Sequence, residues 1–191
     1  MDQEKILQMV NKFRYINKLK TIYRSSSVED RKESDAEHTF SCIMLADMLI
    51  DLVSVKINKL KVYDLLLYHD LLEIETGDIP LSPLQEEVEY KEDSTCLTKC
   101  AQKIPLPLKE KFIKNHNEFI ERKTMESKFA KAIDALDPLI HELDYKKDWC
   151  GWSREFLIKK KSKYLEPFPE LLELFHYCLD YMDQEGYFSE N

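Results

Sequence analysis

The segment at residues 68–80, YHDLLEIETGDIP, places a histidine and several carboxylates beside leucines. His69 and Asp70 are adjacent, Glu73 follows one helical turn later, and Asp78 comes directly after Gly77. Charged side chains are almost never fully buried unless they are paired or bind a metal. Imidazoles and carboxylates can ligate a divalent cation and transfer protons. The segment therefore predicts a chemical site with partners elsewhere in the chain.

Two further side chains could supply those partners. His38 lies early in a predicted helix, and Asp134 lies in the apolar helical segment FAKAIDALDPLIHEL. On a helix, the side chains of the adjacent residues His69 and Asp70 would point about 100 degrees apart. They could bind one ion only if it lay beside the helix, as a metal held between helices does. Two imidazoles and two carboxylates suit Mn, Fe, Co, Ni or Zn. Taken alone, the pair also fits a hydrogen-bonded core histidine beside a surface carboxylate.

Other possible ligands are interpreted as structural. Asp137 and His141 lie one helical turn apart, and an i,i+4 pair of this kind is more often a surface pair. The five cysteines are an odd number, and Cys96 and Cys100 have the spacing of one helix face rather than that of a zinc ribbon. We therefore expect free thiols.

The elements that must position these residues are predicted to be helices. A chain of 191 residues with 3 Gly and 7 Pro has a core-forming length but few residues suited to the turns of a large sheet. The segment SSSVEDRKESDAE reads as a polar loop, ending in a capping box of Ser34 and Glu37. Apolar spacing and helix-end signals predict helices over about 4–20, 34–53, 59–75, 82–103, 108–122, 125–143, 153–163 and 168–184.

Charge and the N-terminal sequence exclude several function classes. The formal net charge of −8 argues against binding a nucleic-acid polymer by general electrostatics. The first residues, MDQEKILQMVNKF, carry charges throughout, so we expect neither a signal peptide nor a membrane span there. A cytoplasmic protein without a membrane partner is the expectation.

The order of motifs resembles a known family. ESDAEHTF, YHDLLEIETGDIP and KAIDALDPL resemble the H…HD…D signature of HD-domain metal-dependent phosphohydrolases, in the branch that contains bacterial 5'-deoxynucleotidases. The resemblance covers roughly residues 5–145. It implies an all-α HD-domain bundle of about six to eight helices, forming a single domain over 1–191 with C-terminal helices at about 153–184 packed on the core.

The resemblance also implies roles for individual residues. One divalent metal ion (Mn, Co, Fe, Ni or Zn) would be bound by four ligands: His38, His69, Asp70 and Asp134. Glu73 would be the acid/base residue, and Asp78 a second catalytic or substrate-orienting carboxylate. Such a metal would activate water and neutralise phosphoryl charge.

A basic segment precedes these motifs. Six cations lie between Lys5 and Arg24, and no acidic residue follows until Glu29. Because the related nucleotidases place a phosphate-binding arginine in this segment, we expect a phosphate contact from Lys18, Lys20 or Arg24. The segment INKLKTIYR departs from the family, which often has an Arg-Trp or Gly-Trp pair near the sugar, and no tryptophan precedes Trp149. This departure leaves open the preference for deoxyribose.

The leading prediction is a 5'-nucleotidase that releases phosphate from ribo- or deoxyribonucleoside monophosphates. The expected partners are a small phosphorylated substrate, a nucleotide, and a second copy of the chain in a homodimer. Two alternatives are another HD-type chemistry, such as guanosine polyphosphate hydrolysis, and a non-catalytic helical module that binds a metal or nucleotide. Glu73 and Asp78 argue against the module, because a structural metal needs neither. The aromatic C-terminal region is expected to pack on the core or on a second subunit.

Overall fold

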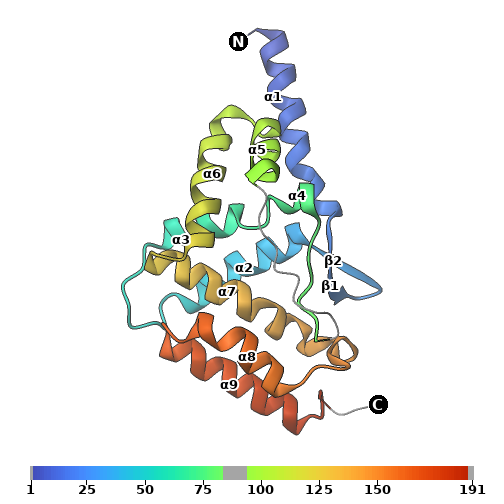
Figure 1. Ribbon diagram of the computed structural model, residues 1–191, viewed down its shortest axis with the longest axis vertical. Helices are drawn as coiled ribbons and strands as arrows, with labels where there is room; N and C mark the ends of the chain where they lie inside the picture. Colours follow the sequence, from blue (N-terminus) through green and yellow to red (C-terminus); the bar gives the residue numbers. More distant parts are fainter. Residues whose placement is uncertain (1, 84–93, 189–191) are drawn as a thin grey trace.

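The computed structural model describes residues 2–83 and 94–188, and these residues form helices with one two-stranded hairpin (Figure 1). The all-α prediction is confirmed. The α-helices are, in chain order, α1 (Gln3–Ile16), α2 (Asp35–Leu49), α3 (Lys59–Tyr68), α4 (Glu73–Thr76), α5 (Ser94–Lys103), α6 (Leu106–Glu121), α7 (Met125–His141), α8 (Arg154–Leu165) and α9 (Pro169–Gln184). The shorter elements are η1 (Asn17–Thr21), β1 (Tyr23–Val28), β2 (Arg31–Ser34), η2 (Glu142–Asp144) and η3 (Lys146–Trp149).

The centre of the molecule is formed by α2, α3 and α7, which contact one another. The apolar face of α7 that the sequence predicted is fully buried at Phe129, Ile133 and Leu136. The C-terminal helices α8 and α9 lie side by side and contact α7, at the end of the molecule opposite to α1 (Figure 1). Phe168 packs its ring edge-on against Phe129 and so joins this layer to the core.

The segment predicted as a polar loop instead forms the antiparallel hairpin of β1 and β2, so that prediction is wrong. Ser27 pairs with Lys32, and the turn places Glu29 at a φ of 53°. Ser26 donates a hydrogen bond to Glu142 Oε1 at 2.5 Å, and the Ser27 amide donates one to Asp148 at 2.8 Å. These distant carboxylates hold a strand that has no alternation of apolar side chains to reveal it. The capping box of Ser34 is present as predicted.

The helix predicted over about 59–75 is interrupted. α3 ends at Tyr68, and α4 begins at Glu73. Between them the amide of Glu73 bonds to the carbonyl of Asp70 at 2.9 Å, a shorter i−3 connection than the α-helical one. His69 and Asp70 therefore lie in a tight turn after α3, and α4 ends at Thr76, followed by the capping residue Gly77, whose φ is 73°. Gly77 ends the helix as predicted.

Two other boundaries also differ. The first helix ends at Ile16, and the predicted continuation to about residue 20 is the 3-10 turn η1. Ser82 and Pro83, predicted to start a helix, are not helical, and residues 84–93 of that prediction lie outside the described residues.

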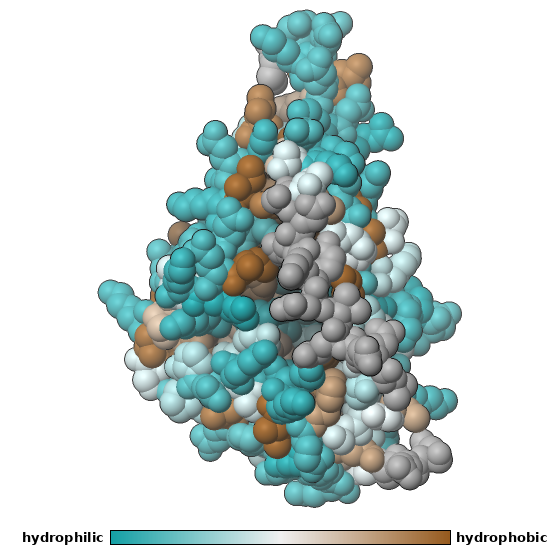
Figure 2. All heavy atoms as spheres, viewed as in Figure 1, coloured by the Kyte–Doolittle hydropathy of each residue, from teal (hydrophilic) through white to brown (hydrophobic). Residues whose placement is uncertain are grey.

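The surface is largely hydrophilic on the face drawn in Figure 2, with separate apolar patches. Elsewhere, α2 exposes Phe40, Met44 and Met48 at helical spacing, with 68%, 54% and 62% of these residues accessible. None of the helices in the described part of the chain has both the length and the hydropathy of a membrane span. The homodimer, the single domain and the cytoplasmic location stay predictions.

Candidate metal centre and catalytic pocket

The four residues predicted as metal ligands come together between α2, the turn after α3, and α7. The Nε2 atom of His38 lies 3.1 Å from Asp134 Oδ1 and 3.7 Å from Asp70 Oδ2. The Nε2 atom of His69 lies 3.1 Å from Asp70 Oδ2 and 3.8 Å from Asp134 Oδ1. Cys42, one turn after His38 on α2, adds a buried thiol 3.5 Å from His38 Nε2, which the sequence reasoning did not anticipate.

Both imidazoles are held by their other nitrogen. His38 Nδ1 lies 2.8 Å from Asp137 Oδ2, and His69 Nδ1 lies 2.6 Å from the carbonyl oxygen of Leu66. Because these oxygens accept, each Nδ1 is the donor and each Nε2 keeps its lone pair for the cluster. His69 Nε2 is buried and has no hydrogen-bond partner among the described residues. These features fit a divalent metal ion.

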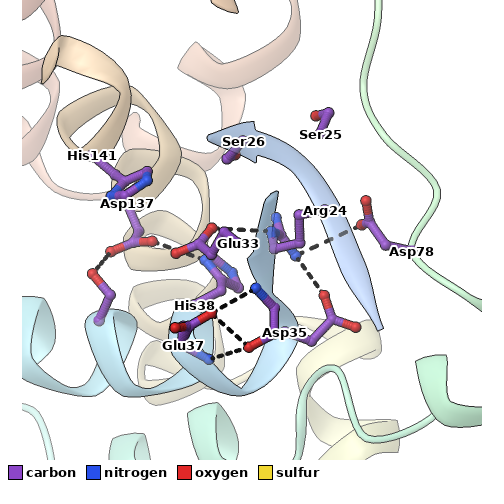
Figure 3. Close-up of polar contacts among 12 residues, drawn as sticks. Arg24, Ser25, Ser26, Glu33, Asp35, Glu37, His38, Asp78, Asp137 and His141 are labelled. Atoms are coloured by element: carbon purple, nitrogen blue, oxygen red, sulfur yellow. Dashed lines mark hydrogen bonds and ion pairs between the residues drawn. The ribbon is translucent and has the colours of Figure 1, made fainter. Parts of the chain in front are cut away.

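Asp137 is not the surface residue that the sequence suggested. Its carboxylate is buried, with 2% of the residue accessible, and it accepts from the hydroxyl of Ser41 at 2.5 Å as well as from His38. His141 does not pair with it in a surface i,i+4 contact but bonds through Nε2 to the carbonyl oxygen of Ser27 at 2.8 Å. Burial against α2, rather than helix periodicity, decides the role of Asp137 (Figure 3).

We expect Asp137→Asn to weaken metal binding by about 10–100-fold, the usual cost of changing a group that orients a ligand. An amide can present its NH2 group to Nδ1 or accept more weakly through its oxygen, so the preference of His38 for a free Nε2 is reduced. Isothermal titration of the metal-free protein with Mn²⁺ measures the change. An unchanged affinity would show that Asp137 does not orient His38.

A second carboxylate group borders the cluster. Oxygens of Asp35, Glu73 and Asp78 lie within 4.8 Å of one another. Both carboxylate oxygens of Asp35 and one oxygen of Glu73 are buried without a hydrogen-bond partner. Asp35 is a residue that the sequence reasoning missed, although it precedes Ala36 within the motif ESDAEHTF. The structure thus places both predicted catalytic carboxylates together, with a third beside them.

Burial and mutual repulsion govern the ionisation of this group. Burial raises the pKa of Glu73 well above its usual range, and the negative charge of Asp70 raises it further. Burial likewise raises the pKa of Asp35 to about 6. By contrast, the pKa of Asp70 falls to about 2, because the attraction of His69 outweighs the effect of burial. Glu73 is therefore the carboxyl group here that most readily keeps a proton, whereas Asp70 stays ionised.

Arg24 is the predicted phosphate-binding cation that reaches the site. It lies on β1, and its Nη1 atom lies 3.6 Å from Asp35 and 3.7 Å from Asp78 (Figure 3). The same nitrogen lies 3.4 Å from Asp70. The structure does not bring Lys18 and Lys20 to the same place. Both are exposed on η1, where the Lys18 ammonium stands over the ring of Tyr15.

The two groups open into one cavity of about 330 Å³. Asp70, Glu73, Asp78 and Asp134 line one part of it. The other part comes from the C-terminal region, which sequence reasoning treated as packing: Trp149, Trp152, Lys160, Lys161, Lys163 and Tyr164. Trp149 does pack inside, donating from its ring nitrogen to the carbonyl oxygen of Glu142 at 3.0 Å, whereas Trp152 is half-buried. Tryptophans therefore reach the cavity from a part of the chain far from INKLKTIYR.

Comparison with known proteins identifies the family. A family model described as HD domain matches residues 16–172. The chain is 25% identical to the 5'-deoxynucleotidase HDDC2 of Xenopus laevis over 140 residues, which cover 73% of this chain and 67% of that protein. It is 23% identical to the human 5'-deoxynucleotidase HDDC2 over 140 residues, 73% of this chain and 66% of that protein. The aligned part thus spans about two thirds of these two relatives.

Solved structures share the fold. A predicted metal-dependent phosphohydrolase from Magnetospirillum magnetotacticum superimposes with a TM-score of 0.81 at 23% identity, covering 96% of this chain and 95% of that one. A conserved hypothetical protein from Pyrococcus furiosus gives a TM-score of 0.54 at 24% identity, covering 82% of this chain and 94% of that one. The match of the family model over residues 16–172 shows that the chain belongs to the HD-domain family, as its motif order indicated.

Proposed function

We propose that this protein is a metal-dependent 5'-nucleotidase that releases phosphate from ribo- or deoxyribonucleoside monophosphates. One observation carries the proposal: the cluster of two imidazoles and two carboxylates reaches, through Asp70 and Asp134, a cavity that Glu73, Asp78 and Arg24 also line. The likeness to proteins named 5'-deoxynucleotidase supports the choice of substrate class.

Four residues would hold the metal: His38, His69, Asp70 and Asp134. Their side chains offer borderline and hard donors that suit Mn, Co, Fe, Ni or Zn. A divalent metal ion there would lower the pKa of a bound water and offset the negative charge of the phosphoryl oxygens. The buried histidines are fixed by Asp137 and by the Leu66 carbonyl, so the donor atoms are positioned before the metal binds.

The neighbouring residues would handle the proton and the substrate charge. Glu73 lies in the cavity lining, and its raised pKa keeps it protonated at neutral pH, so that it can donate a proton. Hydrolysis breaks the bond between phosphorus and the ester oxygen, so that oxygen must receive a proton as it leaves. Asp78 lines the cavity beside Glu73, and Arg24 forms ion pairs with Asp70 and Asp78, so its positive charge would reduce the repulsion between the two carboxylate groups.

A panel of ribo- and deoxyribonucleoside 5'-monophosphates tests the proposal. We expect metal-supplemented protein to release inorganic phosphate from at least one member, and chelated protein to release none. Nucleoside 3'-monophosphates and guanosine tetraphosphate are the comparison substrates. If only guanosine tetraphosphate released phosphate or pyrophosphate, the protein would instead be a guanosine polyphosphate hydrolase. If the metal-loaded protein hydrolysed none of the substrates, a non-catalytic module would be favoured.

A further inference from the structure

The cations that line the cavity differ in whether they form ion pairs with carboxylates. Arg24 lies within 3.7 Å of Glu33, Asp35, Asp70 and Asp78, so its charge is offset by four carboxylates. Lys131 donates to Asp134 Oδ2 at 2.6 Å. Both cations are therefore already paired with carboxylates of the predicted metal ligands or of the neighbouring acidic residues. A phosphate that enters the cavity would be bound more tightly if a further cation, in addition to the proposed metal ion, contacted it.

Lys161 on α8 differs from both. Only 9% of the residue is accessible, and its ammonium donates to the carbonyl oxygen of Ala135 at 2.7 Å. No carboxylate of the described residues lies within ion-pair distance of it, and Glu142, which lines the same cavity, is hydrogen-bonded to Ser26. An ammonium has three donors, and a buried cation without a charged partner is costly.

The position of Lys161 relates it directly to the proposed metal site. Ala135 follows Asp134 in α7, so the ammonium contacts the same helical turn that carries a predicted metal ligand. Lys161 and Asp134 both line the cavity. An anion that reaches the metal cluster would therefore lie beside a positive charge that forms no ion pair with any carboxylate of the described residues.

A purely structural role is the competing explanation. Pro138 lies inside α7 and cannot donate the amide hydrogen bond that a helix normally makes there. A lysine that donates to a carbonyl of the same turn could support the interrupted helix. That role needs a hydrogen-bond donor, but it does not need a positive charge, and this difference separates the two explanations.

We propose that Lys161 binds the phosphate group of the substrate, so that the anion is held from α8 rather than from the basic N-terminal segment. This assignment rests on the proposed function for the identity of the substrate, but phosphate binding by Lys161 can be measured without turnover. Burial also lowers the pKa of Lys161 to about 8, so a bound anion would stabilise its charged form.

Isothermal titration with inorganic phosphate tests the assignment on the metal-loaded full chain. Lys161→Gln keeps a donor for Ala135 but removes the charge, and we expect its dissociation constant for phosphate to rise about tenfold or more. Lys161→Arg should restore most of the affinity. Lys159→Gln, on an exposed position of the same helix, is the matched control and should bind phosphate like the wild type. Metal content is measured in each variant.

The outcomes separate the explanations. If Lys161→Gln lowers the melting temperature while its phosphate affinity stays within about twofold of the wild type, the role is structural and the assignment is overturned. A wild-type protein that binds metal but no phosphate overturns it as well. If no nucleotide of the panel is hydrolysed but Lys161→Gln binds phosphate more weakly than the wild type, the nucleotidase proposal fails. Lys161 then remains an anion-binding residue. With an active substrate, the same substitution should raise KM more than it lowers kcat.

Discussion

Replacing Glu73 by glutamine should lower the rate of phosphate release by at least about a hundredfold, because general acid-base catalysis typically contributes 10²–10⁴-fold. Glutamine has nearly the shape of a protonated glutamate, and the surroundings of Glu73 already raise its pKa and favour that form. The amide cannot exchange a proton at neutral pH. Steady-state phosphate release from the best nucleotide of the panel measures the effect.

Two controls make the result specific. Metal content and the melting temperature should match the wild type, because Glu73 is not among the four predicted ligands. Glu75→Gln is the matched substitution in α4: its carboxylate accepts from Tyr15 at 2.5 Å and from Lys103 at 2.7 Å, away from the cavity lining. It should keep turnover. Near wild-type activity of Glu73→Gln would remove Glu73 from the acid-base role, and loss of its metal would make Glu73 a ligand.

Replacing Asp134 by alanine should weaken metal binding more than about a hundredfold, beyond the range expected for groups that only orient ligands. The substitution removes one of the two negatively charged metal ligands. It also removes the partner of the Lys131 ammonium, which lies 2.6 Å from Asp134 Oδ2 in the wild type. Stabilisation by metal should fall accordingly, since metal at 100 times its dissociation constant stabilises the folded state by about 2.7 kcal/mol. Metal analysis after dialysis and thermal melts with added Mn²⁺ measure both effects.

Comparison of Asp134→Ala with Asp137→Asn makes this prediction sharper, because both residues lie on α7 one turn apart. The first should abolish stoichiometric retention of metal, whereas the second should weaken affinity and keep a measurable site. In a variant with both Lys131 and Asp134 changed to alanine, an unpaired ammonium cannot be the cause of weaker metal binding. If Asp134→Ala retains metal at wild-type affinity while Asp137→Asn loses it, Asp137 is the ligand.

The sequence by itself determined the helical class and the set of residues to examine. Apolar side chains at intervals of three and four, and the capping signals at Ser34 and Gly77, act over one or two turns, so they can be recognised without knowledge of the fold. The motif order likewise predicted that His38, His69, Asp70 and Asp134 converge, and their nitrogen and oxygen atoms lie 3.1–3.8 Å apart.

Only the tertiary structure decided what surrounds these residues. Asp137 lies 99 positions from His38 in the chain, and Ser26 lies 116 positions from Glu142, so their hydrogen bonds leave no local pattern in the sequence. The hairpin forms because distant carboxylates accept its hydrogen bonds, and Lys161 becomes a buried cavity residue because α8 packs on α7. Burial and pairing arise from contacts between segments, and they determine whether the same charged residue is a surface group, a support or a binding group.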